Sequence, residues 1–400
     1  MTAEVALLNK RGIVLAADSA VTIGGAKVMT NANKLFTLDS PHFIGLMVYG
    51  NADLGSVPWE IIFKTYRKNI GSKIFDSLSE YCDNLIEYIN QANFLKQSRD
   101  DILLVNKYVQ SYFSEIDRKL EQFPMNPSTE FSDKFNTILQ NYFIKLIEEP
   151  LSKVGYDKSY FSDKTLNYIN GLLDDQYPLL DDTAKELFMK VVFNGLNSQD
   201  YYSNQVTGLV VAGYGELDVF PGIRVYNVDG FYQDKLKFSI AKDYMISDGP
   251  GETIAAMETF AQSDVINNLV SGIDDGVDNF RHRQFDSLKN EVKKHVADDK
   301  NSEIEELFVQ TEKAFYNHIQ TNYRNPTYMM IDSLSLEEIA NMAETFVSVT
   351  GFKRKYSNNL ESVGGPTDVL IISRGDGPVW FKRKLYFDPQ TNPGYITRRK

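Results

Sequence analysis

Two short apolar strands joined by a tight turn come almost directly after the start of this 400-residue chain. Residues 4–8 and 13–15 have the apolar, strand-like character of a β-hairpin, and the Asn-Lys-Arg-Gly segment between them consists of turn-forming residues. The second strand runs through two small alanines, which allow close packing, into the carboxylate of Asp18. A chain that starts in this way is constrained to fold around an N-terminal antiparallel hairpin.

The strand pattern continues for a further thirty residues. A second hairpin is expected around Gly24-Gly25, and it leads through residues 27–29 to Lys34. A third strand, residues 43–49, ends at Gly50, where the pattern changes from strand to helix. The start of the chain, Asp18, Lys34 and Gly50 are therefore all predicted at the ends of short antiparallel strands.

The residue at the start of the first strand is Thr2, and its side chain is small enough for removal of Met1. Trimming would leave a free α-amine and a hydroxyl on one residue, which is a nucleophile with its own general base. The reference pKa of an α-amine is about 7.7–8.0, so part of it is unprotonated near neutral pH and can accept the hydroxyl proton. Such a site needs no histidine.

Five motifs in order resemble the proteasome β-type subunits and their bacterial two-ring relatives, within the N-terminal nucleophile (Ntn) hydrolase superfamily. They follow Thr2 and are "GIVLAADSAVT" (12–22), "KLFTLD" (34–39), "GLMVYGNAD" (45–53), "GLVVAGYGELDVFPGIRVYNVDG" (208–230) and "VGGPTDVLIISRGDG" (363–377). The resemblance implies an α+β fold, a four-layer αββα sandwich of two stacked antiparallel sheets flanked by helices, here with large helical insertions.

The resemblance also implies a role for each matching residue. Thr2 would supply the hydroxyl nucleophile and the amine base, and Lys34 would be the neighbouring cation that lowers the pKa of both. Asp18 would pair with Lys34, because a lone buried ammonium is costly. The backbone N–H of Gly50 would stabilise the oxyanion. The alternative from the residues alone is an ordinary Asp18–Lys34 ion pair and a plain turn at Gly50.

The chain departs from the family pattern around this site. Ala20 replaces the arginine that is common two residues after the acid, and Pro250 falls where the glycine-rich loop has an accessory serine. In a gapless alignment Leu360 and Val363 fall at the other accessory positions. The nearby polar or flexible groups that could take over the accessory roles are Ser19, Asp248, Gly249, Glu361 and Ser362.

The composition limits the classes of molecule that the chain is expected to bind. The chain carries 42 basic and 54 acidic residues, a net charge of −12, which argues against nucleic acid and against an anionic membrane surface. It has no apolar run of the ~18 residues that a transmembrane helix needs. The absence of a signal-peptide pattern and the single Cys82 are typical of a cytoplasmic protein. The four histidines show no metal-ligand spacing, so no metal and no cofactor is expected.

The length exceeds that of a proteasome-type subunit, and the surplus falls into residues 56–204 and 262–332. Apolar residues near the 3.6-residue period predict helices in both regions, so we expect one domain, residues 1–400, with two helical elaborations. Helices are predicted over residues 59–66, 74–95, 102–123, 131–147, 166–173, 184–193, 252–260, 285–296 and 304–319, and from a capping box at Ser335 to Phe346.

The first elaboration is rich in aromatic residues, which fits either helix–helix packing or a cap or oligomer interface. Packing is the simpler interpretation. The functional prediction is a threonine-type peptidase or amidohydrolase that cleaves peptide or other amide bonds through an acyl-enzyme. The partners would be peptide or unfolded-protein substrates and further copies of the chain in a homo-oligomer. The alternatives are a catalytically silent, proteasome-like scaffold or binding subunit and a small-molecule amidase.

Overall fold

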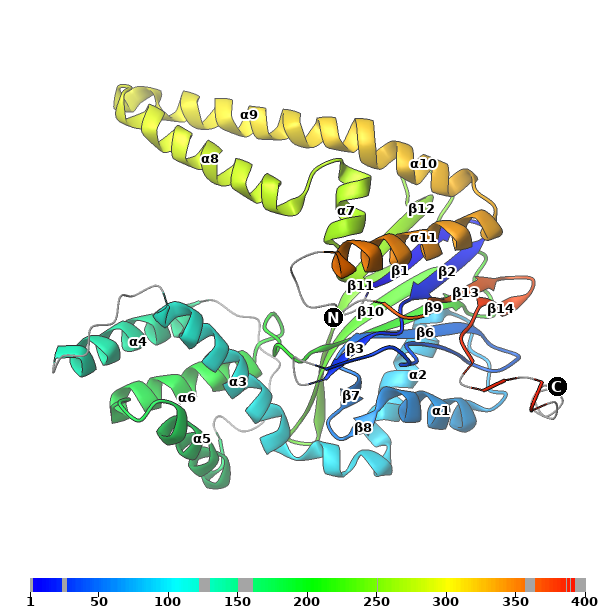
Figure 1. Cartoon of the computed structure of the whole chain (residues 1–400), viewed down its shortest axis with the longest axis horizontal. Coiled ribbons are helices and arrows are strands. Elements are labelled where there is room, and N and C mark those ends of the chain that lie inside the picture. Colours follow the sequence, from blue (N-terminus) through cyan, green and yellow to red (C-terminus); the bar gives the residue numbers. More distant parts are fainter. Residues whose placement is uncertain are drawn as a thin grey trace.

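The computed structural model describes residues 3–23, 27–121, 130–149, 161–249, 251–356, 364–385, 387–388 and 390–392. Thr2, Gly24-Gly25, Pro250 and the segment 357–363, which contains Glu361 and Ser362, lie outside the described residues. Within the described part, helices are combined with antiparallel sheets (Figure 1), as the predicted α+β class requires.

The first sheet is built around the predicted N-terminal hairpin. Its strand order is β12 (Ala255–Ala261), β1 (Ala3–Asn9), β2 (Gly12–Ala17), β13 (Asp368–Ser373) and β14 (Gly377–Lys382), with every neighbouring pair antiparallel. All residues of β1 and β2 are buried, which explains why both strands are mainly apolar instead of alternating, with Glu4 and Asn9 as the polar residues of β1. The late motif at residues 363–377 supplies β13, as predicted.

The second sheet contains the other strands that the motifs predict. Its order is β11 (Lys235–Met245), β10 (Gly222–Tyr232), β9 (Thr207–Tyr214), β6 (Phe43–Gly50) and β5 (Leu35–Thr37), again antiparallel throughout. Two small hairpins complete the strands: β3 (Val21–Ile23) with β4 (Lys27–Met29), and β7 (Asp53–Leu54) with β8 (Val57–Pro58).

The two sheets pack face to face, and helices cover their outer faces. Leu8 and Leu15 of the first sheet share a core with Met47 and Val210 of the second. The helices α1 (Trp59–Ile70) and α2 (Leu78–Gln91) pack on the outer face of the second sheet. On the outer face of the first sheet lie α7 (Asp264–Ser271), α10 (Asn325–Ser333) and α11 (Leu336–Lys355). The predicted capping box opens α11, with Ser335 and Glu338 capping each other.

The first elaboration includes α1 and α2, and its later helices form a separate group with a hydrophobic core of its own (Figure 1). This group comprises α3 (Asp101–Leu120), α4 (Glu130–Glu148), α5 (Asp163–Gln176) and α6 (Asp182–Leu196). Tyr112 stacks on Tyr201 with 5.1 Å between the ring centroids, and Phe113 lies edge-on to Tyr177. These aromatic residues therefore serve helix–helix packing, as expected.

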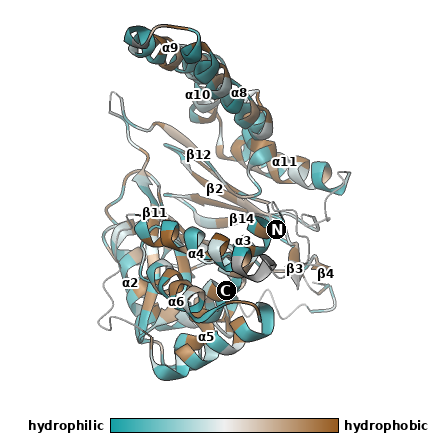
Figure 2. Ribbon diagram, turned by 90° about the vertical axis from the view of Figure 1, so that its left-hand side faces the viewer, coloured by the Kyte–Doolittle hydropathy of each residue, from teal (hydrophilic) through white to brown (hydrophobic). Residues whose placement is uncertain are grey.

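The middle of the second elaboration, between α7 and α10, projects from the body of the molecule. A long hairpin of α8 (Asp275–Lys294) and α9 (Asn301–Ile319) extends past α7 and α10, and Figure 2 shows the same hairpin pointing away from the strands. A π-helical turn at Gln320–Arg324 joins α9 to α10. Neither α8 nor α9 has a buried residue, so this pair of helices contributes no side chain to the main cores.

The predicted helix at residues 252–260 is wrong. The structure has β12 there, antiparallel to β1 with Ala3 opposite Ala261 and Asn9 opposite Ala255. Without this strand β1 would be an exposed sheet edge, and pairing with it satisfies the backbone groups of β1. A tertiary partner some 250 positions away in the sequence thus overrides a local pattern that fits a helix.

Candidate active site

The carboxylate of Asp18 is the centre of the candidate site. It follows β2, it is only 2% exposed, and its Oδ1 lies 2.5 Å from Nζ of Lys34. The same oxygen accepts a hydrogen bond from the backbone N–H of Ala3 at 3.2 Å. Oδ2 accepts one from the N–H of Gly364 at 2.9 Å and a longer one from Ala20 at 3.4 Å. The acid therefore joins three distant parts of the chain.

Lys34 is buried between two carboxylates. It precedes β5 and is 4% exposed, and its carbonyl accepts the N–H of Val48 at 3.1 Å, which fixes it against β6. Besides Asp18, the buried carboxylate of Glu4 approaches Nζ with Oε1 at 3.4 Å. A buried ammonium is stable only with such partners. Glu4 was absent from the sequence prediction, because in the strand pattern it is just one residue of an apolar segment.

Gly50 lies in the same pocket as Lys34. The pocket has a volume of about 590 Å³ including space open to solvent, and its wall includes Lys34, Val48, Gly50 and Asp53. Gly50 ends β6 with φ of +80°, and a Cβ there would lie 2.4 Å from the carbonyl oxygen of Val206. Only glycine fits both the left-handed backbone and this close approach.

Tyr49 lines this pocket and lies in the electrostatic field of the buried Glu4 carboxylate. Its ring stacks on Phe260 with 5.0 Å between centroids, and it lines the pocket beside Gly50. Burial, together with the fields of Glu4 and Glu258, raises the pKa of Tyr49 to about 12. The phenol therefore remains protonated at neutral pH.

Ala3, the first described residue, contacts the Asp18–Lys34 ion pair. Ala3 N is the peptide nitrogen that links Ala3 to the preceding residue, and it donates to the same Asp18 oxygen that Lys34 contacts. The backbone N–H of Asp18 in turn donates to the carbonyl of Ala3 at 3.1 Å. Thr2 itself lies outside the described residues.

The predicted accessory residues are placed differently from one another. Ser19 is fully buried, but its hydroxyl donates to the carbonyl of Pro366 at 2.6 Å, so it ties two segments together. Glu361 and Ser362 lie outside the described residues, although Gly364, a little further along, contacts Asp18 directly. The late segment therefore reaches the site, as the resemblance implies.

Asp248 and Gly249 are not at this site. Asp248 pairs with Lys10, at the end of β1 opposite to Ala3. A seven-residue strand places the two ends of β1 about 20 Å apart, so neither Asp248 nor Gly249 is near Lys34. The assignment of these two residues as accessory groups is wrong, because it assumed a helix where β12 returns along β1 from the far end.

The end of β12 brings other residues to the start of the chain. Ala261, opposite Ala3, has φ of +58°, which is unusual for a residue with a side chain. Gln262, which is buried, and Ser263 follow it directly. The sequence signal that could have located them is the apolar run from Ala255, once it is interpreted as a strand.

Neither a metal-binding cluster nor a membrane-spanning helix is found in the described part of the chain. No group of three or more His, Cys, Asp or Glu side chains among those residues could hold a metal ion. None of the described helices combines the length and apolar character that crossing a bilayer requires.

Comparison with known proteins gives a limited result. No model of a protein family and no curated protein sequence matches the chain. Among solved structures it is similar to Anbu from Hyphomicrobium sp. strain MC1, with a TM-score of 0.30 and 11% identity over 100% of this chain and 94% of that one. Anbu (ancestral beta-subunit) from Yersinia bercovieri gives 0.30 and 11%, over 99% and 93%. The helical assembly of the Anbu complex from Pseudomonas aeruginosa gives 0.31 and 11%, over 99% and 95%. Likeness at this level establishes neither family nor activity.

Proposed function

We propose that the chain is an N-terminal-threonine hydrolase of the Ntn type, which cleaves peptide or other amide bonds through an acyl-enzyme. The fold would be a single four-layer αββα domain, residues 1–400, enlarged by helices at 56–204 and 262–332. The observation that carries the proposal is the shared contact at Asp18, whose Oδ1 receives both Nζ of Lys34 and the amide nitrogen that follows Thr2.

Covalent geometry explains why this contact matters. The Ala3 nitrogen that is held on Asp18 is covalently bonded to the preceding residue, and consecutive Cα atoms are about 3.8 Å apart, so the proposal takes Thr2 to be beside Lys34. A hydroxyl and an amine near the Lys34 ammonium would both become easier to deprotonate, since a nearby positive charge disfavours protonated amine and favours alkoxide.

The reaction would proceed in two halves. The Thr2 hydroxyl attacks the amide carbonyl while its proton passes to the α-amine, and the oxyanion is stabilised by the N–H of Gly50. The C–N bond then breaks, the departing amine takes the proton, and an ester to Thr2 remains. Water attacks this ester, the α-amine accepts the water proton, and the carboxylic acid leaves as the threonine hydroxyl is restored.

The test is the intact mass of the purified protein before and after treatment with a β-lactone or an epoxyketone. We expect a chain without Met1 and one adduct, mapped by peptide sequencing to Thr2. Thr2→Ala should abolish the adduct and leave the fold intact, whereas Thr2→Ser should retain it. Retention of Met1 in the protein from its native host, or an adduct that persists in Thr2→Ala, would refute the proposal.

One observation favours a catalytically silent scaffold as the second candidate. Asp248 and Gly249 lie at the far end of β1 and cannot support the threonine amine. The probe experiment separates the two candidates, because a silent subunit would form no adduct even without Met1. The substrate class, peptides as opposed to side-chain or small-molecule amides, is decided by a panel of peptide and amide substrates with the Thr2→Ala protein as blank.

The proposal also includes a cellular location and binding partners. We propose a cytoplasmic protein that acts on peptides or unfolded chains, assembles with further copies of itself, and requires neither metal nor cofactor. The charge of −12 and the single cysteine support this setting. Sedimentation velocity of the purified chain tests the assembly.

A further inference from the structure

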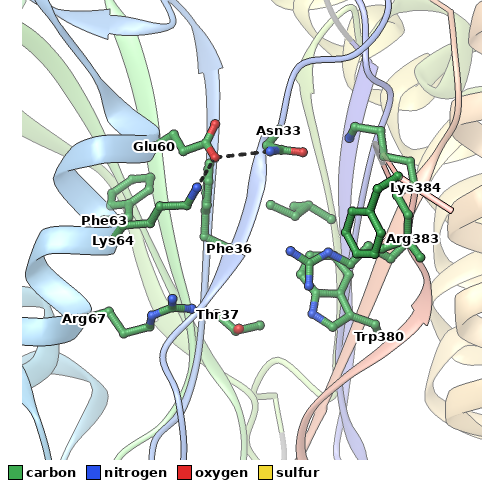
Figure 3. A pocket seen from close by; sticks show the side chains of 13 residues that line it. Asn33, Phe36, Thr37, Glu60, Phe63, Lys64, Arg67, Trp380, Arg383 and Lys384 are labelled. Carbon is green, nitrogen blue, oxygen red and sulfur yellow. Dashed lines mark hydrogen bonds and ion pairs between the residues drawn. The ribbon is translucent and has the colours of Figure 1, made fainter. Parts of the chain in front are cut away.

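Two hollows of the molecule lie outside the pocket at Gly50. One is the cavity between β5 and the chain after β14, where Lys64 pairs with Glu60 on the wall (Figure 3). The other is a groove of about 690 Å³, including space open to solvent, between α2 and the edge strand β11. The proposed chemistry does not use this groove, which combines an apolar floor with an acidic rim.

The floor of the groove is an apolar surface on the outer face of the second sheet. Tyr226 of β10 and Phe238 of β11 contact each other edge-on, with 5.9 Å between the ring centroids. Ile240, two positions further along β11, is 51% exposed. Alternate residues of a strand share a face, so Phe238 and Ile240 face the groove together. Contiguous apolar surface of this kind is typical of a docking site.

The rim of the groove carries an excess of negative charge. Asp83 and Glu87 lie one turn apart on α2, and both are exposed. The nearby cation is Arg224, which is shared between Asp83 at 3.1 Å and Asp243 at 2.7 Å. Glu87 accepts a hydrogen bond from Nε2 of Gln91 at 2.9 Å and has no basic partner among the described residues. Three carboxylates against one guanidinium leave two negative charges beside the apolar floor.

The end of α11 has the complementary character. Phe352 and Tyr356 lie four residues apart, with 4.9 Å between their ring centroids, and they are 66% and 71% exposed. Lys355 places its Nζ 5.9 Å from the centroid of Tyr356 and has no acidic partner in the described part of the chain. The two cations before it both pair with Asp264. Exposed aromatic residues beside a cation are typical anchors of protein interfaces.

The aromatic pair and the groove cannot meet within one molecule. α11 packs on the outer face of the first sheet and α2 on the outer face of the second, and Figure 1 shows the two helices on opposite sides of the strands. The two sheets, which pack about 10 Å apart, therefore lie between them. A contact between these surfaces must join two copies of the chain, and each copy then still has one unused groove and one unused aromatic pair.

We propose that the aromatic pair at the end of α11 inserts into the groove between α2 and β11 of a second copy of this chain. The inference names an interface for the self-assembly that is part of the proposed function, and it rests on that assembly. Phe352 and Tyr356 pack on the floor around Ile240, and Lys355 lies beside Glu87. The two surfaces of this interface differ, so copies add head to tail and form a ring or an open filament.

Sedimentation velocity of the full-length protein over a range of concentrations tests the interface. The unmodified chain should assemble beyond the dimer. Ile240→Glu, and the double variant Phe352→Ala, Tyr356→Ala, should each weaken the association roughly tenfold or more. Ile144→Glu on α4 and Phe280→Ala on α8 change exposed apolar residues elsewhere and are the matched controls. Assembly that survives in both interface variants would overturn the proposal.

A mixture of the two interface variants separates a lost contact from a lost fold. The Ile240→Glu protein keeps its aromatic pair, and the double-alanine protein keeps its groove, so an equimolar mixture contains one intact interface. We expect each variant alone to be monomeric and the mixture to form a heterodimer and nothing larger. A mixture that stays monomeric would show that the two surfaces do not bind each other.

Reversal of the charges tests the contact between Lys355 and Glu87. Lys355→Glu and Glu87→Lys should each weaken the association, and both changes in one chain should restore most of it, because the two charges again attract. Lys313→Glu, at an exposed position of α9, is the matched control and should have no effect. If the double reversal is no better than the single ones, Lys355 does not lie beside Glu87 and the arrangement is wrong.

Two further measurements identify the occupant and separate the inference from the hydrolase function. The basic residues Arg398-Arg399-Lys400 are the other candidate for the acidic groove, and a chain that ends at Asn392 should assemble unchanged. Loss of assembly in that chain would contradict the proposal. The β-lactone adduct is measured on the same preparations. An adduct without assembly leaves the hydrolase proposal and refutes the interface, whereas assembly that only the interface variants lose, without an adduct, supports the interface and refutes the hydrolase.

Discussion

Nζ of Lys34 lies 3.4 Å from Oε1 of Glu4, a second buried carboxylate on the lysine that already contacts Asp18. Among the described side chains, Lys34 thus contacts two carboxylates. A carboxylate charge on Glu4 near the proposed N-terminal amine would favour the protonated amine, which is the inactive form of the proposed base. Glu4 would thus oppose the effect of Lys34 and set the pH at which the site becomes active.

Glu4→Gln tests this relationship. The amide keeps the shape and removes the charge, so the acid limb of the pH profile should move to lower pH, by up to about one unit. The measurement is the rate of β-lactone adduct formation from pH 5 to pH 9. Asp248→Asn removes a carboxylate at the far end of β1 and should leave the profile in place. An unchanged acid limb in Glu4→Gln would mean that Glu4 serves packing alone.

Gly50→Ala should be more damaging than an ordinary glycine substitution. Its Cβ would meet the carbonyl of Val206 at 2.4 Å, and its φ is +80°. Gly71→Ala is the matched control, because Gly71 also has a positive φ of +56° but open space around it. We expect Gly71→Ala to lose about 1–3 kcal/mol from backbone strain alone, and Gly50→Ala to lose more than Gly71→Ala, with no adduct formed. Urea unfolding measures both, and equal losses would contradict the clash.

Lys237 predicts a pH dependence of stability. It belongs to β11 and is buried against the helical group, where its ammonium donates to the carbonyls of Gly195 and Tyr201 at 2.9 Å and contacts the hydroxyl of Tyr108. Burial lowers its pKa to about 7, against the opposing field of Asp229. The folded state therefore binds fewer protons than the unfolded state between about pH 7 and the ordinary lysine pKa, so the stability rises with pH in that window.

The measurement compares the free energy of unfolding of the unmodified protein and of Lys237→Met at pH 7 and pH 9. The advantage of the unmodified protein should grow by about 2 kcal/mol over this interval. Higher pH is avoided, since burial raises the pKa of tyrosines such as Tyr66 and Tyr112, and their effect on stability has the opposite sign. Lys190→Met, on the exposed side of α6, is the control. A pH-independent difference would contradict the assignment.

The sequence predicted the parts of this molecule that local pattern determines. The hairpin of β1 and β2 and the helix opened by Ser335 depend on neighbouring residues, and both are present. Asp18 and Lys34 were paired by their spacing in a known motif, and they are in contact.

The parts that the sequence did not predict depend on contacts between distant segments. β12 was interpreted as a helix, because its strand conformation comes from pairing with β1 and not from its own pattern. The direction of β12 then decides that Asp248 lies far from Lys34 and that Gln262 lies close to Ala3. The cavity of Figure 3 likewise unites residues near positions 35, 64 and 383, and no local pattern connects these.

Arg281 makes several of the contacts that join α8 and α9 in the projecting hairpin. Arg281 of α8 donates two hydrogen bonds to the carboxylate of Glu312 on α9, both of 2.9 Å, and its guanidinium carbon lies 3.9 Å from the centroid of Phe315. It also contacts Asp278 on its own helix. Since α8 and α9 have no buried residue, the two helices are held together by this forked pair, by the ion pairs of Lys289 and Lys293 with Glu305, and by the aromatic contact of Phe285 with Phe308.

Arg281→Ala should therefore loosen the hairpin without affecting the sheets. We expect hydrogen exchange in α8 and α9 to become at least tenfold faster, equivalent to about 1.4 kcal/mol of local opening, while β1 and β10 keep their protection. Arg281→Lys retains the charge but not the fork, so its effect should be intermediate. The exposed neighbour Arg283→Ala should leave exchange unchanged. If Arg281→Ala accelerates exchange in the sheets as much as in the hairpin, the hairpin does not open as a separate unit.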